Sequence, residues 1–107
     1  MQFAPKPMRY SKDDLTLTLH FEENLISTTV KELQAECTRV LDESGEPARI
    51  VADLAEVEMI DSQGLNFLLG LYQDAHDHNR QFHVTGASPA NQRLFAFVNL
   101  SERFGLA

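Results

Sequence analysis

The sequence contains a single cysteine, Cys37, and no long apolar run. One cysteine cannot form an intrachain disulfide, which suits a reducing compartment. No stretch approaches the roughly 20 apolar residues that a membrane-spanning helix needs. The N-terminus also lacks the apolar core of a signal peptide. We therefore expect a soluble, cytoplasmic protein with no direct membrane insertion.

Positive charge is also scarce. The chain has 9 Lys and Arg against 16 Asp and Glu, a net charge of −7. Proteins that bind nucleic acid or anionic membranes need clustered basic residues, so both are disfavoured as partners. We expect a protein or small-molecule partner instead.

No cofactor or metal site is expected either. The chain has no glycine-rich phosphate loop. His76 and His78 stand two apart on a predicted helix and so point in different directions. The acidic stretch 55–61 lacks the regular oxygen spacing of a calcium loop.

With 107 residues, the chain is expected to form one domain over 8–107 after an irregular, proline-containing segment 1–7. Residues 15–21 alternate apolar and polar side chains, which predicts a half-buried strand. A short strand at 8–10 is expected to pair with it as a hairpin. Two further strands are predicted, at 49–54 and at 81–86. The strand at 49–54 is predicted from its β-branched and almost continuously apolar residues.

Three helices are predicted between and after these strands. An apolar face repeating every three or four residues marks one at 27–43, with Ser27 near its start. A second runs over 62–79. Ser88 and Pro89 begin a third, and Phe104 is expected to pack a last turn in the tail. Alternating strands and helices predict an α/β fold with a mixed four- to five-stranded sheet, an N-terminal hairpin and three to four helices packed on it.

Ser62 opens the second helix, after a strand that ends near Leu54. Functional groups gather at such carboxyl ends of strands in open α/β sheets. A serine there is a favoured helix cap, at the positive end of the helix dipole. A nucleophile elbow, G-x-S-x-G, is disfavoured because Ile60 stands where the first glycine is needed.

Three stretches around this turn resemble the STAS domain: Ile50-Val51-Ala52-Asp53-Leu54, then Val57-Glu58-Met59-Ile60-Asp61-Ser62-Gln63-Gly64-Leu65, and Phe82-His83-Val84-Thr85-Gly86-Ala87-Ser88-Pro89. This is the domain of bacterial anti-sigma factor antagonists, also found on the cytoplasmic tails of sulfate transporters. The resemblance implies the STAS fold and a regulatory role in transcription.

The resemblance also implies a phosphorylation switch at Ser62. In such antagonists, an ATP-using anti-sigma factor kinase phosphorylates the matching serine, and a phosphatase reverses the step. The unphosphorylated form binds the anti-sigma factor and frees the sigma factor. Added phosphate would deepen an acidic neighbourhood and repel an acidic partner, or clash with a closely packed one. We expect the partner-binding residues to be Asp61, Gln63, Gly64, Asp53 and Glu58.

Two points stay open at this stage. Gly64 admits either a close approach by the partner's backbone or tight packing within the domain. The loop 21–26 lacks the glycine that the family often has there, which leaves the identity of the partner unsettled.

One alternative function is a constitutive STAS subunit of a larger assembly, such as a lipid-transport ABC transporter. An enzyme ranks last, because no set of nucleophile, base and orienting group can be assembled from the sequence. His20 and His83 lie on predicted strands and are expected to be packed or edge residues. Cys37 is expected to be a small buried hydrophobe.

Overall fold

The computed structural model describes residues 8–105. Seven regular elements follow one another along the chain: β1 (Met8–Asp13), β2 (Thr16–Phe21), α1 (Val30–Glu43), β3 (Arg49–Asp53), α2 (Ser62–Asp77), β4 (Gln81–Thr85) and α3 (Pro89–Phe97). The strands form one sheet in the order β1-β2-β3-β4. The mixed sheet, the N-terminal hairpin and the helices confirm the predicted fold.

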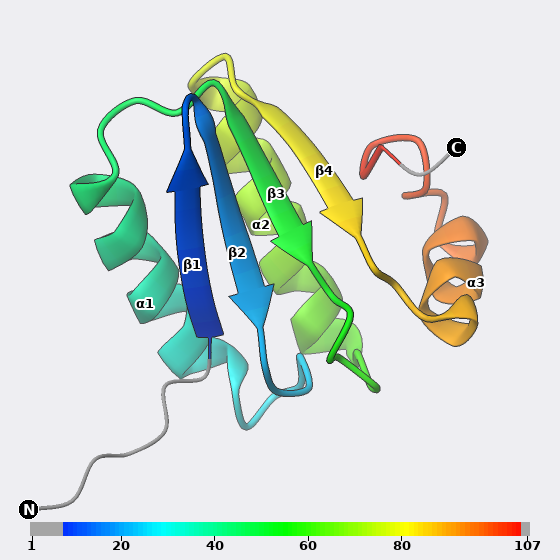
Figure 1. The fold of residues 1–107 in the computed structure, drawn as a ribbon. Coiled ribbons are helices and arrows are strands. Elements are labelled where there is room, and N and C mark those ends of the chain that lie inside the picture. The colour runs from blue at the N-terminus through cyan, green and yellow to red at the C-terminus, as the bar shows by residue number, and fades with distance from the viewer. Residues whose placement is uncertain (1–7, 106–107) are drawn as a thin grey trace, which may run out of the picture.

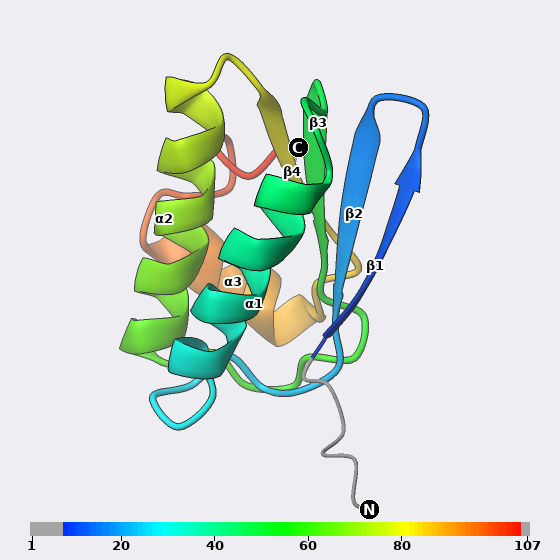
Figure 2. The ribbon, with the colours of Figure 1, turned by 90° about the vertical axis from the view of Figure 1, so that its left-hand side faces the viewer.

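The directions of the strands determine at which end of the sheet their carboxyl ends lie. β1 pairs antiparallel with β2, whereas β2, β3 and β4 are parallel. The carboxyl ends of these three strands therefore meet at the lower end of Figure 1. Helices α1 and α2 cover one face of the sheet, and within residues 8–105 the opposite face is open (Figure 2).

The core lies between the sheet and the helices. Leu17, Leu19 and Phe21 alternate with more exposed residues along β2 and are buried on the helix side. The predicted C-terminal turn completes this core. Phe104 is fully buried, and its ring meets those of Phe95 and Phe82 at centroid distances of 5.1 and 5.7 Å.

The same turn bonds to β4, one of the two edge strands of the sheet. The backbone N–H of Val84 in β4 donates to the carbonyl oxygen of Phe104 at 2.8 Å. An unpaired edge strand is a template for aggregation, so this bond protects β4 as well as fixing the tail.

Some predicted boundaries are wrong. The first helix begins at Val30 and not at Ser27, because Thr29 closes a turn with Ile26: its N–H donates to the Ile26 carbonyl at 2.9 Å. The second helix ends at Asp77, two residues early, just before Asn79 adopts a left-handed φ of 58°. The predicted irregular segment 1–7 lies outside the described residues.

The length and the apolar character of the helices were compared with what a membrane span needs. Across residues 8–105, none of them is both long and apolar enough to cross a membrane.

Candidate functional site: the turn at the start of α2

The serine turn lies at the carboxyl end of the parallel strands (Figure 1). Ser62 is the first residue of α2, and the loop 54–61 joins it to the end of β3. The loop 22–29, which follows β2, runs beside it: Leu25 and Ile60 form an isolated parallel bridge. Two loops far apart in sequence thus form one surface around Ser62.

Asp61, and not Ser62, caps the helix. Its Oδ1 accepts a hydrogen bond from the backbone N–H of Gly64 at 2.9 Å, and its Oδ2 accepts one from the N–H of Ser27 at 2.9 Å. Capping is therefore the role of the residue before the serine, which corrects the interpretation of Ser62 as the cap. These N–H groups, that of Gly64 first, also lower the pKa of the Asp61 carboxyl.

Backbone and side-chain hydrogen bonds hold the two loops together. The N–H of Leu25 donates to the Met59 carbonyl at 3.0 Å, and the N–H of Asp61 donates to the Leu25 carbonyl at 3.1 Å. The Oδ1 of Asn24 accepts from the N–H groups of Glu58 and Met59, each at 3.0 Å. The loop 22–29 is thus a structural support of the serine turn.

The resemblance associates the loop 21–26 with the partner surface, but the sequence does not predict that Asn24 and Leu25 support the serine turn. The only signal was an asparagine in a loop between a strand and a helix, where its side chain often bonds nearby backbone groups. Its partners are 34 and 35 residues away, so no local pattern identifies them.

Gly64 resolves the alternative left open by the sequence. The residue is buried, and a Cβ at this position would lie 2.0 Å from the carbonyl oxygen of Leu25. The glycine is therefore required by close packing within the domain. Gly64 supports the turn from inside, and its missing side chain faces Leu25 rather than an outer surface.

The expected partner-binding residues divide into two groups. Ser62, Gln63 and Glu58 are exposed together on the turn, and Met59 beside them is 58% exposed. Asp53, in contrast, has both carboxylate oxygens engaged near the end of β3. Its Oδ2 lies 2.8 Å from Nδ1 of His20, and its Oδ1 accepts from the N–H of Ala55.

The Ser62 side chain makes no hydrogen bond to any other residue of 8–105. Its hydroxyl is exposed at the first position of a helix whose cap is another residue. This arrangement leaves the hydroxyl accessible to an external reagent or enzyme.

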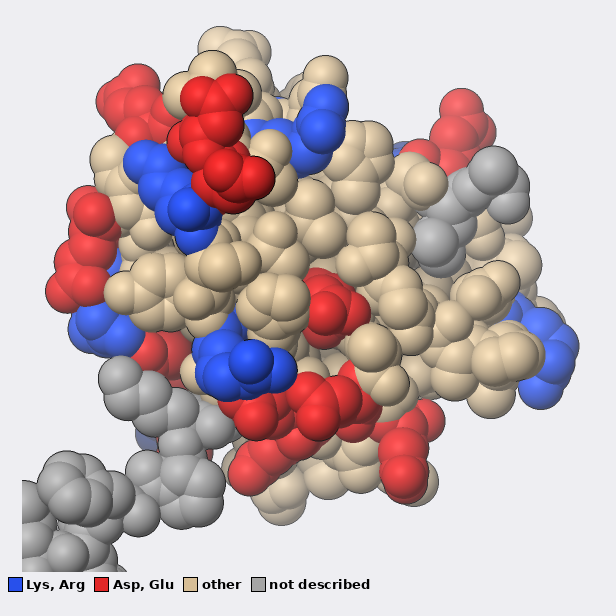
Figure 3. Space-filling view, viewed as in Figure 1, with Lys and Arg blue, Asp and Glu red and all other residues tan. Residues whose placement is uncertain are grey.

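Acidic side chains dominate the loops next to the turn. A hollow of about 360 Å³ is lined by four glutamates and three other residues: Glu22, Glu23, Glu56, Glu58, Asn24, Ile26 and Thr29. Figure 3 shows a contiguous red acidic patch at the lower end of the molecule, besides separate acidic groups elsewhere on this face. A surface of this charge favours a partner with a basic or neutral contact face.

Solved structures share this architecture. The structure of the anti-sigma factor antagonist SpoIIAA in its unphosphorylated form matches with a TM-score of 0.66 and 15% identity, over 84% of this chain and 82% of that one. The NMR structure of the protein TM1081 matches with a TM-score of 0.71 and 18% identity, over 95% of this chain and 79% of that one.

The family comparison covers nearly the whole sequence. The model of the STAS domain matches residues 7–107, which include every strand and helix described above and the serine turn. The chain belongs to the STAS domain family.

Proposed function

We propose that this chain is an anti-sigma factor antagonist of a bacterial partner-switching pathway. In the unphosphorylated form it binds an anti-sigma factor that is also a serine kinase, and phosphorylation of Ser62 releases it. One observation carries the proposal: Ser62 is exposed at the head of α2, while Asp61 performs the capping. The Ser62 hydroxyl is thus available for modification without loss of a structural bond.

The electrostatics of the turn explain how phosphate would act. A phosphoserine carries about −1.5 to −2 charges at neutral pH. The Gly64 N–H, which would otherwise attract an anion at the helix start, already binds Asp61. A phosphate on Ser62 therefore adds charge beside the carboxylates of Asp61 and Glu58 and projects outward. It opposes docking of a partner without disturbing the core.

Residues 8–107 would act as one binding domain in the cytoplasm, where kinase and phosphatase would meet it. Its contact surface would comprise Glu58, Met59, Asp61, Ser62 and Gln63, with Gly64 shaping the turn from beneath. The switch needs no catalysis by this chain and no cofactor of its own. The shared fold with an anti-sigma factor antagonist supports this role.

The test begins with the protein isolated from its own cells. Phosphosite mapping should find phosphate on Ser62, and the S62A variant should not accept it from the captured kinase and ATP. The control is S27A, which removes an exposed serine from the neighbouring loop. Phosphorylation of S62A at the parent's rate would refute the assignment.

Partner capture distinguishes the alternative function. The parent and S62A should retain a kinase-type anti-sigma factor, and S62D should lose it. If parent, S62A and S62D all capture the same ABC transporter subunits and no kinase, the domain is a constitutive subunit and Ser62 is not a switch.

A further inference from the structure

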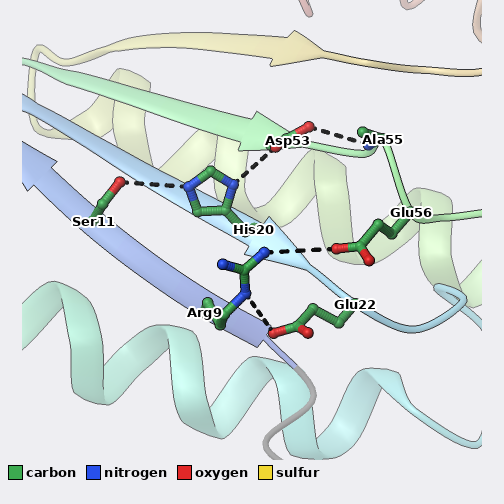
Figure 4. Close-up of polar contacts among 7 residues, drawn as sticks. All are labelled: Arg9, Ser11, His20, Glu22, Asp53, Ala55 and Glu56. Carbon is green, nitrogen blue, oxygen red and sulfur yellow. Dashed lines mark hydrogen bonds and ion pairs between the residues drawn. The ribbon is translucent and has the colours of Figure 1, made fainter.

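Three side chains from three strands line up on the open face of the sheet (Figure 4). Oγ of Ser11 in β1 lies 3.4 Å from Nε2 of His20 in β2. Nδ1 of the same imidazole lies 2.8 Å from Oδ2 of Asp53 in β3. The order serine, histidine and carboxylate is that of a nucleophile, a base and an orienting group.

Charge determines the direction of these hydrogen bonds. An ionised carboxylate only accepts, so Nδ1 of His20 carries the proton that it donates to Asp53. In the neutral ring Nε2 is then unprotonated, and it accepts a hydrogen bond from the Ser11 hydroxyl. The other oxygen of Asp53 accepts from the N–H of Ala55 at 3.1 Å, which holds the carboxylate in place.

The packing of the sheet supports the same arrangement. His20 and Asp53 are direct partners across the parallel β2–β3 pair, and both side chains are largely covered, at 29% and 27% exposure. Ser11, on the outer strand, is exposed. The base is thus sheltered and fixed, and the hydroxyl faces solvent.

A hollow gives a small molecule access to this hydroxyl. It has a volume of about 360 Å³ and is lined by Met8, Arg9, Tyr10, Ser11, His20 and Glu36. This volume is within the usual range for small-ligand pockets. The Asp53 carboxylate lies behind His20 and does not line the hollow, as expected for an orienting group.

We propose that Ser11 is a base-activated serine that accepts an acyl group from a small carboxylic ester. Its Oγ forms a bond to the ester carbonyl carbon while Nε2 of His20 takes the hydroxyl proton. The bond between that carbon and the leaving oxygen then breaks, and the leaving oxygen takes the proton from His20. The products are a Ser11 ester and a free alcohol or phenol. Asp53 is a positioning residue that fixes the tautomer of His20.

The site was invisible in the sequence because its three members lie on separate strands. It is independent of the proposed switch, since neither the position of Ser62 nor its phosphorylation enters the chemistry. Ser62 provides an internal comparison: it is also an exposed serine, but no imidazole is bonded to it among the described residues.

The test uses the intact unphosphorylated protein and p-nitrophenyl acetate. Release of p-nitrophenolate is followed by absorbance, and peptide mapping locates the acetyl group. A positioned general base contributes about 10²–10⁴-fold, so Ser11 should be acetylated on the order of 10²-fold faster than Ser62 in the same molecule. Equal rates at Ser11 and Ser62 would overturn the proposal without any variant being needed.

Two variants test the roles of the partners. H20N should slow Ser11 acetylation to the rate of Ser62, because the base is lost. D53N should also slow it, since an amide donor in place of the carboxylate favours the Nε2–H tautomer, which cannot accept the Ser11 proton. Circular dichroism checks that each variant is folded. Unchanged Ser11 acetylation in folded H20N would contradict the proposal.

Discussion

Asp61 accepts a hydrogen bond from the backbone N–H of Ser27, 34 residues earlier in the chain, at 2.9 Å. With its second oxygen it caps α2 through Gly64. One carboxylate therefore ties the loop after β2 to the helix that begins at Ser62. Its charge state and the stability of the serine turn are linked.

The first prediction concerns Asp61 and pH. Because the pKa of Asp61 is lowered in the folded protein, its charged form stabilises the fold fully above the ordinary carboxyl pKa, and this stabilisation is lost as the pH falls through the lowered value. D61N should therefore unfold at lower urea concentration than the parent near neutral pH, and the difference between the two urea midpoints should narrow as the pH falls below the ordinary carboxyl pKa. The control is E58Q, whose side chain lies on the same loop but caps no helix; it should show no such gap. A gap that is independent of pH would contradict this role.

The second prediction compares two glycines of α2. G64A should destabilise the domain by about 1–3 kcal/mol, because its Cβ would collide with the Leu25 carbonyl oxygen. G70A places a Cβ where nothing lies within 4 Å and should stabilise the helix by about 0.5–1 kcal/mol. Urea unfolding of both variants measures the contrast. Equal effects of the same sign would show that Gly64 is not held by close packing.

The third prediction concerns the C-terminal turn. F104A should cost about 3–5 kcal/mol, because the ring is fully buried between Phe82 and Phe95. Phe97 is 86% exposed, so F97A should change the free energy of unfolding by less than about 0.5 kcal/mol. Thermal or urea unfolding tests both. A small effect of F104A would mean that the tail is not part of the core.

The fourth prediction separates folding from binding at the switch. S62D should leave the free energy of unfolding within about 0.5 kcal/mol of the parent, because the side chain is exposed and makes no capping bond. The same variant should weaken binding to the anti-sigma factor about tenfold or more, since the added carboxylate loses its water in a closely packed contact. Calorimetric titration measures the affinity. Loss of folding in S62D would make Ser62 a structural residue.

The fifth prediction concerns the single cysteine. Burial, with a smaller contribution from Glu36, raises the pKa of the Cys37 thiol to about 12. The thiol is only 2% exposed and is not ionised near neutral pH, so a disulfide reagent should react with it slowly until the protein is unfolded. Fast labelling of the folded protein would show that α1 opens readily.

Features that depend on neighbouring residues in the chain, such as helix caps and strand alternation, could mostly be predicted from the sequence. Ser88 does cap α3, its Oγ accepting from the N–H of Asn91 at 3.1 Å, and Pro89 follows it. The strand at 15–21 was visible from its alternation. The start of α1 was misplaced because Ser27 resembles a cap. In the structure Thr29 closes the preceding turn with Ile26, and the N–H of Ser27 donates to Asp61.

The continuous part of the candidate site could be predicted from the sequence, whereas the contacts between separate segments could not. The sequence identified Ser62 and its neighbours, because they form one continuous motif. The bonds of Asn24 to residues 58 and 59, and the alignment of Ser11 with His20 and Asp53, depend on strand register and loop pairing. No periodicity in the chain reports which residues of separate segments become neighbours.

The order of the strands has a consequence for how the chain folds during synthesis. Because β1, β2, β3 and β4 are neighbours in chain order, each new strand that leaves the ribosome finds its partner already in place. The N–H of Val84 on the outer side of β4 is different, because its partner is the carbonyl oxygen of Phe104, which is synthesised later. A chain shortened before Phe104 would leave the N–H of Val84 in this edge strand unpaired, and an unpaired edge strand is a template for aggregation.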